Sequence, residues 1–306
     1  MWFIFGLAAA SCFGLRGILY QWTSQRKVNR SALLFGVYLS GALVAAIVNA
    51  VVGQHWTEAA WWGALMGCFS FVANASMYKG YAVGKASLIA LMTGLPPLVV
   101  VLGAFFLWEE KLGAGQLAGF AVVLIGLVAI RYSSDLRTGQ LRGLTWGFLT
   151  MVFFGFTDLT SKQSTISDAA TLPTLIMMYA TGTLLFAGQW LLDAVRAGKA
   201  ERPGKAKREI AASAEQAQPK APSAVWPIRR TVLWGMTVGL TNIAGMMFLI
   251  PAFRDGATGI VSALGAMNAA IVLAYAKFCL KEEMRRTEAI GMALALGGIV
   301  VMRLAS

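Results

Sequence analysis

The chain has 306 residues, of which 58% are hydrophobic and 13% are charged, and its mean hydropathy is +0.65. This composition excludes an ordinary soluble domain. One histidine and three cysteines are too few, and too widely spaced, to form a zinc or haem site. No nucleophile–base group is recognisable either, so we expect neither a cofactor nor an enzymatic activity.

Ten apolar segments follow one another along the chain, each about 20 residues long, which is the length that a helix needs to cross a membrane. They are residues 2–21, 31–52, 59–80, 86–108, 114–131, 143–161, 171–192, 231–251, 257–280 and 287–304. The connections between them leave no room for a folded soluble domain. The sequence therefore predicts an all-α membrane protein with ten transmembrane helices.

The net charge of +12 is distributed unevenly over the connections between these segments. Connections after odd-numbered segments hold 20 Lys and Arg residues, whereas connections after even-numbered segments and the two termini hold four. Because basic loops remain in the cytoplasm, we expect both termini outside, in a bacterial inner (plasma) membrane. The positive charge thus indicates topology and contact with membrane lipids, and no nucleic-acid partner is expected.

One connection, Ala194–Arg230, is long and rich in Ala, Lys, Glu and Pro. Such a composition cannot bury an apolar core. We expect a flexible cytoplasmic linker here, and the alternative is a regulatory or partner-binding segment.

The sequence repeats itself over five of the predicted spans. A shift of 172 residues aligns 62–131 with the C-terminal part of the chain, and a shift of 141 aligns the start of the chain with the sixth segment. The aligned pairs include Trp62/Trp234, Gly63/Gly235, Gly67/Gly239, Gly119/Gly291, Gly126/Gly298, Arg131/Arg303, Gly6/Gly147 and Gly14/Gly155. Because each copy crosses the membrane five times, the second copy must be inverted, as in many secondary transporters. We therefore expect two five-helix repeats, residues 1–142 and 143–306, the second interrupted by the linker 194–230.

Glycines recur at four-residue spacing inside the spans, for example Gly115 and Gly119. Such spacing lets helix backbones approach closely in a membrane. The sequence leaves two alternatives open for this face, packing within the chain and formation of a homodimer.

The fourth and ninth segments carry signals for an interrupted helix. Pro96 and Pro97 lie within the fourth segment, and a proline removes a backbone hydrogen bond and opens the preceding turn. The opened turn would contain Met92, Thr93 and Gly94, and its repeat partner precedes Asn268 in the ninth segment. Since exposed backbone inside a membrane must face protein or a water-filled cavity, these turns are candidate walls of a solute site; the alternative is a purely structural kink.

Among the charged residues within the predicted spans, Arg16 in the first and Asp158 in the sixth form the most informative pair. The 141-residue shift aligns Arg16 with Thr157, so the two charges are offset by one residue between the repeats. Intramembrane charges are costly and normally have partners inside the helix bundle. Either they form a fixed ion pair, or Arg16 holds a substrate carboxylate and Asp158 an ammonium group or a coupling proton.

Further polar groups at membrane depth are Asn74 and Tyr78 in the third segment and Asn242 in the eighth. Such residues more often bond one helix to another than bind a ligand. They complete the predicted substrate-binding set, which is Arg16, Asn74, Tyr78, Met92, Thr93, Asp158, Asn242 and Asn268.

Two diffuse motifs occur once in each repeat. The first copy reads Gly94-Leu95-Pro96-Pro97, then Leu107-Trp108-Glu109-Glu110-Lys111, and the second reads Gly265-Ala266-Met267-Asn268, then Leu280-Lys281-Glu282-Glu283. With the glycines that follow them, these motifs resemble the drug/metabolite transporter superfamily, in its ten-helix EamA-type branch. The resemblance covers the chain outside Ala194–Arg230 and implies an exporter or exchanger of amino acids, drugs, sugars or other small metabolites.

The chain departs from that family at two points. Ten-helix members usually have both termini in the cytoplasm, whereas the basic residues here predict the reverse. Asn268-Ala269 also replaces the Pro96-Pro97 pair in the second copy, so the two interrupted helices need not bend alike.

The leading hypothesis is a secondary transporter of a small metabolite, amino acid or drug that works by alternating access, driven by protons, by exchange or by the solute gradient. One alternative is a lipid or lipid-carrier flippase of the same fold, and another is a membrane scaffold whose active part is the linker. A polar cavity between the repeats would favour the first hypothesis. A lateral opening lined by apolar side chains would favour the flippase.

Overall fold

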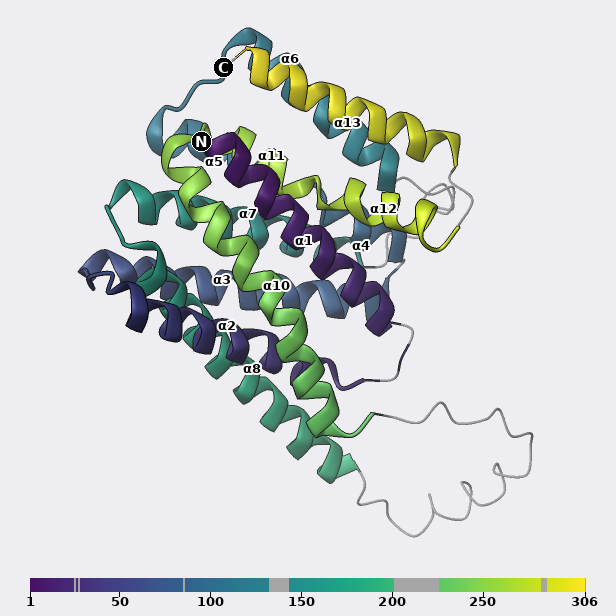
Figure 1. Cartoon of the computed structure of the whole chain (residues 1–306). Coiled ribbons are helices and arrows are strands. Elements are labelled where there is room, and N and C mark those ends of the chain that lie inside the picture. Colours follow the sequence, from purple (N-terminus) through teal and green to yellow (C-terminus); the bar gives the residue numbers. More distant parts are fainter. Residues whose placement is uncertain are drawn as a thin grey trace.

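A computed structural model describes residues 1–24, 26, 28–84, 86–131, 143–200, 226–281 and 285–305. The helices are α1 (Trp2–Ser24), α2 (Arg30–Val52), α3 (Trp62–Val83), α4 (Ala86–Met92), α5 (Pro96–Trp108), α6 (Ala114–Arg131), α7 (Leu144–Ile166), α8 (Thr171–Ala200), α10 (Ile228–Asp255), α11 (Thr258–Ala266), α12 (Asn268–Phe278) and α13 (Arg286–Leu304). A short 3-10 helix, Glu58–Trp61, precedes α3. The predicted all-α class is confirmed in the described part of the chain, which forms one bundle (Figure 1).

Within the described residues, eight helical segments are long and apolar enough to cross a membrane. They are Trp2–Thr23, Arg30–Val52, Leu88–Trp108, Ala114–Arg131, Thr171–Arg196, Ile228–Asp255, Thr258–Phe278 and Arg286–Leu304. The other two predicted spans correspond to α3 and α7, which have 22 and 23 residues. Their polar residues lower their hydropathy, but many of these, such as Asn74 and Ser161, are buried against neighbouring helices.

The helix ends alternate between two sides of the bundle (Figure 1). The N-terminus, the C-terminus and the connections after α2, α5, α7 and α10 lie on one side, which we call the terminal side. The C-terminal ends of α1, α3, α6, α8 and α12 lie on the opposite side, which we call the basic side because its connections carry the excess of Lys and Arg. This alternation is the one that the predicted spans require.

The fourth and ninth predicted spans are each divided into two helices. In the first repeat, α4 ends at Met92 and α5 begins with Pro96 and Pro97, whose fixed φ angle suits the first turn of a helix. In the second repeat, only Met267 separates α11 from α12. Both interruptions lie where the sequence indicates them, and the longer one coincides with the two prolines.

Helices α8 and α10 extend into the segment predicted as a linker. Because α8 continues to Ala200 and α10 begins at Ile228, residues 194–200 and 228–230 are helical, and the prediction of a linker is wrong for them. Residues 226 and 227 are described but not helical, and 201–225 lie outside the described residues.

Reciprocal contacts between α2 and α8 show the symmetry of the two repeats. A Cβ atom at Gly182 would lie 2.1 Å from the Tyr38 ring, and a Cβ atom at Gly41 would lie 2.3 Å from the Tyr179 ring. Tyr38 and Gly41 become Tyr179 and Gly182 under the 141-residue shift. The Tyr38–Gly182 and Gly41–Tyr179 contacts are therefore equivalent, and a pseudo-two-fold axis relates one to the other.

The pair formed by α6 and α13 shows the same reciprocity. Gly119 faces the carbonyl of Gly298, and Gly126 faces the carbonyl of Gly291, so the backbones touch at positions that the 172-residue shift exchanges. The Gly115 position meets Ala305, the residue that follows α13. The face that contains Gly115 and Gly119 thus packs within the chain, which is the first of the two predicted alternatives.

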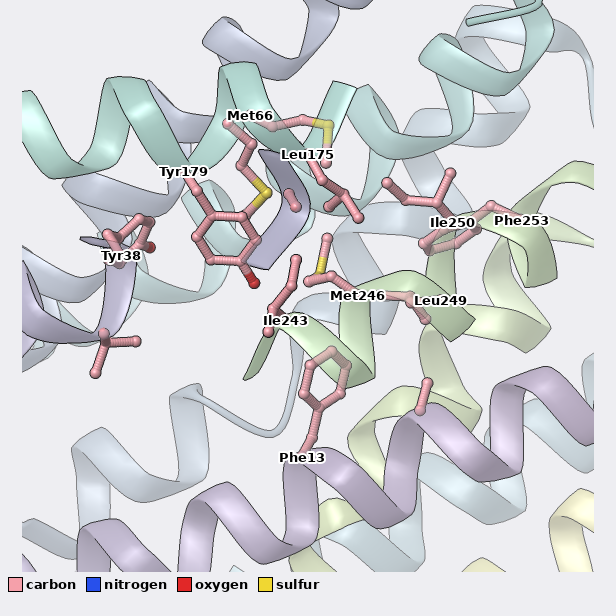
Figure 2. Close-up of a cluster of buried hydrophobic side chains, with 14 of the residues drawn as sticks. Phe13, Tyr38, Met66, Leu175, Tyr179, Ile243, Met246, Leu249, Ile250 and Phe253 are labelled. Carbon is pink, nitrogen blue, oxygen red and sulfur yellow. The ribbon is translucent and has the colours of Figure 1, made fainter. Parts of the chain in front are cut away.

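The repeats form one interlocked body and not two separate lobes. The main helix contacts join different repeats: α1 with α10, α2 with α8 and α10, α3 with α7 and α8, and α6 with α13. The largest buried apolar cluster lies where these helices cross, and its side chains come from α1, α2, α3, α8, α10 and α11 (Figure 2). A ligand site between the repeats is therefore surrounded by helices of both.

Candidate functional site

A cavity of about 1360 Å³ lies between the two repeats. Its wall contains residues from α1, α2, α3, both halves of the two interrupted spans, α6, α7, α8 and α10. It reaches Thr93 at one helix interruption and Gly265, Ala266 and Asn268 at the other. The breaks in the backbone thus face a cavity. Non-helical backbone inside a membrane must face either protein or a water-filled cavity.

The cavity extends to the basic side of the bundle. Its lining includes Arg26 after α1, Arg30 at the start of α2, Tyr81 near the end of α3 and Ala276 near the end of α12. The packing of the interrupted spans explains this direction. The halves α5 and α11 pack against each other on the terminal side, whereas α4 packs mainly on α7, and α12 mainly on α1.

Polar contacts hold the terminal side closed. The Lys162 ammonium donates to the carbonyls of Phe253 and Gly256, at 2.7 and 3.3 Å, where α10 ends. The Glu110 carboxylate accepts from the backbone N–H and the hydroxyl of Thr258, both at 2.6 Å, where α11 begins. A cation at a helix C-terminus and an anion at a helix N-terminus both satisfy orphan backbone groups and the helix dipole.

Arg16 and Asp158 both line the cavity, and each is bonded to a neutral partner. The Arg16 guanidinium donates to the Asn242 side-chain oxygen and stacks on the Phe13 ring, with 4.6 Å between Cζ and the ring centroid. The Asp158 carboxylate accepts from the Ser262 hydroxyl at 2.6 Å. Of the two alternatives raised by the sequence, the fixed ion pair is not the arrangement found.

The two charges lie at different depths. Each is past the middle of its helix, but α1 ends on the basic side and α7 ends on the terminal side (Figure 1). Arg16 is therefore nearer the open end of the cavity, and Asp158 is nearer its closed end. Inverted repeats produce this placement, since equivalent positions fall on opposite sides of the membrane midplane.

The other predicted site residues divide into those that line the cavity and one that does not. Asn74, Tyr78, Thr93, Asn242 and Asn268 contribute to its wall. Asn74 donates to the Ser70 carbonyl at 2.8 Å and to the Tyr38 hydroxyl at 3.4 Å.

Met92 points elsewhere. Its side chain packs on α7, where a Cβ atom at Gly147 would lie 2.9 Å from the Met92 Cγ. It is absent from the cavity wall, because the last turn of α4 rotates it toward α7.

Arg131 lines the cavity although the sequence indicated only a basic residue at the end of a span. Its Nη1 donates to the Ala90 carbonyl at 2.6 Å and to the Thr93 hydroxyl at 2.8 Å, so the guanidinium covers the break between α4 and α5. Gly94 makes room for it, since a Cβ atom there would lie 3.0 Å from the Arg131 Nε. No sequence pattern links Arg131 at the end of α6 to the break between α4 and α5, so the sequence could not predict this contact.

The cavity wall is unbalanced in charge. Four arginines line it, Arg16, Arg26, Arg30 and Arg131, while Asp158 is the only acidic residue among its described lining residues. Four tyrosines, Tyr20, Tyr38, Tyr78 and Tyr81, lie among them.

Comparison with known proteins agrees with this architecture. Residues 1–132 match the model of the EamA-like transporter family. A solved structure described as "Crystal structure of protein" shares the fold, with a TM-score of 0.71, 17% sequence identity, and coverage of 98% of this chain and 96% of that chain. No curated protein matches the chain. The matched part is one of two symmetric repeats that pack into a single transmembrane bundle, so the match to the EamA-like transporter family agrees with the resemblance that the sequence motifs indicated.

Proposed function

We propose that the protein is a secondary transporter that moves a small metabolite, amino acid or drug by alternating access. The observation that carries the proposal is the cavity between the repeats, which reaches both interrupted helices, extends to the basic side and is closed on the terminal side. Repeat-related helices that open on one side and pack on the other are the expected basis of two gates around one site.

Charged and hydrogen-bonding groups in the cavity support a soluble ligand over a lipid chain. Arg16, Asp158 and Asn268 come from different helices and face the same space. The charged groups have hydrogen-bonding requirements that an acyl chain could not meet. We therefore favour a solute transporter over the flippase, and infer a location in the bacterial inner membrane with the cavity facing the cytoplasm.

In this proposal, Arg16 binds a carboxylate of the solute and Asp158 binds an ammonium group or carries a coupling proton. The search for a ligand begins with a thermal-shift screen of purified protein against amino acids, organic cations, sugars and drugs, because a specific ligand raises the unfolding temperature. The strongest stabiliser is then loaded, radiolabelled, into proteoliposomes to measure counterflow. Failure of every stabilising ligand to cross the membrane would contradict the transport proposal.

The roles of the two charges are tested with Arg16→Gln, Asp158→Asn and the double variant. Loss of counterflow in each single variant and in the double variant, with unchanged unfolding temperature, supports binding roles. Recovery of counterflow in the double variant would remove both residues from the site. Asp193→Asn is the matched control, because Asp193 also accepts a hydrogen bond from a serine, Ser31 at 2.7 Å, but does not line the cavity.

A further inference from the structure

The charge of the cavity carries information on the class of solute. Arg16 of α1 and Arg131 of α6, both in the first repeat, face it, and the hydrogen-bond acceptors of both are neutral: an amide oxygen for Arg16, a carbonyl and a hydroxyl for Arg131. Cations at membrane depth are rare and normally have a partner of opposite charge. The described wall offers one carboxylate, Asp158, and that carboxylate is engaged by Ser262.

Arg131 also has an unused donor. Its Nε atom is buried and has no hydrogen-bond partner, although the Nη1 atom of the same guanidinium makes two bonds. A guanidinium presents its donors as a planar fork that matches the oxygens of a carboxylate or a phosphate. Buried donors are ordinarily satisfied, and the described protein atoms supply no acceptor for this one, which lies against Gly94.

Arg16 is similarly arranged. It donates to Asn242 and lies on the Phe13 ring, two contacts that orient a guanidinium without neutralising it. An anion would gain charge-assisted hydrogen bonds from Arg16 that the neutral amide oxygen cannot match.

We propose that the cavity takes a small organic anion, bearing a carboxylate or a phosphate, and that Arg16 and Arg131 are its two anion-binding residues. The proposal rests on the transport function argued above and narrows its substrate class. A zwitterion belongs to the class as well, with its acidic group on an arginine and its amine toward Asp158 at the closed end. The aromatic wall formed by Phe13, Tyr20, Tyr38, Tyr78 and Tyr81 suits a ligand with an apolar or aromatic body.

The sharpest test is a series of ligands that share a phenyl group and differ in charge. Purified full-length protein is heated with millimolar phenylacetate, phenyl phosphate, phenylalanine, phenethylamine or 2-phenylethanol. We expect at least one of the first three ligands to raise the unfolding temperature, and the amine and the alcohol to leave it unchanged. Comparing the temperature shifts of phenylacetate and phenyl phosphate shows whether the site prefers a carboxylate or a phosphate. Comparing phenylalanine with phenylacetate shows whether an amine adds to binding.

Substitutions of the two arginines test whether they cause the stabilisation by the anion. Arg16→Gln and Arg131→Gln are each expected to weaken binding of the stabilising anion at least tenfold, as judged by titration, while the unliganded proteins still unfold cooperatively. Arg131→Lys tests the fork geometry, because lysine keeps the charge and loses the paired donors. Arg303→Gln is the matched control: Arg303 is the repeat counterpart of Arg131, but it lies against Trp2 and Phe3 outside the cavity.

Stronger stabilisation by phenethylamine than by the anions would overturn the anion class, as would an absence of stabilisation by all three acidic ligands. Binding of the anion that persists undiminished in the Arg16→Gln, Arg131→Gln double variant would overturn the assignment of residues. These outcomes are distinct from failure of the transport proposal. An anion that binds through the arginines but shows no counterflow would contradict transport and leave the anion site intact.

Discussion

Glu110 accepts two hydrogen bonds from Thr258, and these bonds join the two interrupted spans on the terminal side. Glu110 follows α5 and Thr258 is the first residue of α11, so one carboxylate ties the first repeat to a helix N-terminus in the second. Under the 172-residue shift, Thr258 corresponds to Ala86, the first residue of α4. The counterpart of Glu110 is Glu282, which lies outside the described residues.

Removing the charge of Glu110 should weaken this closure. Glu110→Gln keeps the shape of the side chain but replaces charge-assisted hydrogen bonds with a neutral amide, so we expect a loss of about 1.5–3 kcal/mol in the free energy of unfolding. Glu109→Gln is the control, since Glu109 is exposed and should shift stability by less than about 0.5 kcal/mol. Denaturant unfolding of both variants in the same detergent measures the difference. Equal stability of the two would show that the cap contributes nothing.

Tyr38 and Tyr179 are repeat partners whose hydroxyl groups have different surroundings. The Tyr38 hydroxyl is bonded to Ser70 and also accepts from Asn74, whereas the buried Tyr179 hydroxyl has no partner. An unsatisfied buried hydroxyl costs roughly 1–3 kcal/mol. Tyr179→Phe should therefore raise the unfolding temperature, while Tyr38→Phe should lower it by the loss of about 1 kcal/mol. The two substitutions remove the same atom from equivalent positions, so a change of the same sign in both would contradict this account.

Much of the architecture was predictable because it depends on signals that are local along the chain. Span length follows from runs of apolar residues, and the break before Pro96 follows from proline chemistry. The inverted repeat followed from residue matches at two fixed shifts, and the Gly119–Gly298 and Gly126–Gly291 contacts join positions that those shifts exchange.

The site was less predictable because it depends on how each helix is rotated about its axis. Met92 and Thr93 are neighbours in sequence, yet only Thr93 faces the cavity. Arg131 looked like a loop cation, but its long side chain reaches the break in another span. The sequence also suggested pairing of Arg16 with Asp158 because they are nearly equivalent, whereas inversion places such positions at opposite depths.

Glycines at helix crossings should tolerate no side chain. A Cβ atom at Gly63 would lie 2.0 Å from the Thr174 carbonyl oxygen, and one at Gly235 would lie 2.2 Å from the Leu33 carbonyl oxygen. Gly63→Ala and Gly235→Ala should each cost about 1–3 kcal/mol of stability through overpacking. Gly188→Ala is the control, because no atom lies within 4 Å of its added Cβ, and alanine should stabilise that helix by about 0.5–1 kcal/mol. Thermal unfolding of the three variants tests the crossing directly, and a stabilised Gly63→Ala would refute it.

The orientation of the whole bundle can be decided with reporters at its two termini. Both termini lie on the terminal side, opposite the open end of the cavity (Figure 1), and the 20-to-four distribution of basic residues predicts that this side is outside the cell. A reporter that fluoresces only in the cytoplasm should therefore stay dark when fused to either terminus and become bright when inserted between residues 201 and 225. Immunoblotting controls for the amount of intact fusion. A bright signal from both terminal fusions would reverse the orientation, and the cavity would then open to the outside; the symmetry of the repeats would be unaffected, because it rests on the contacts between them.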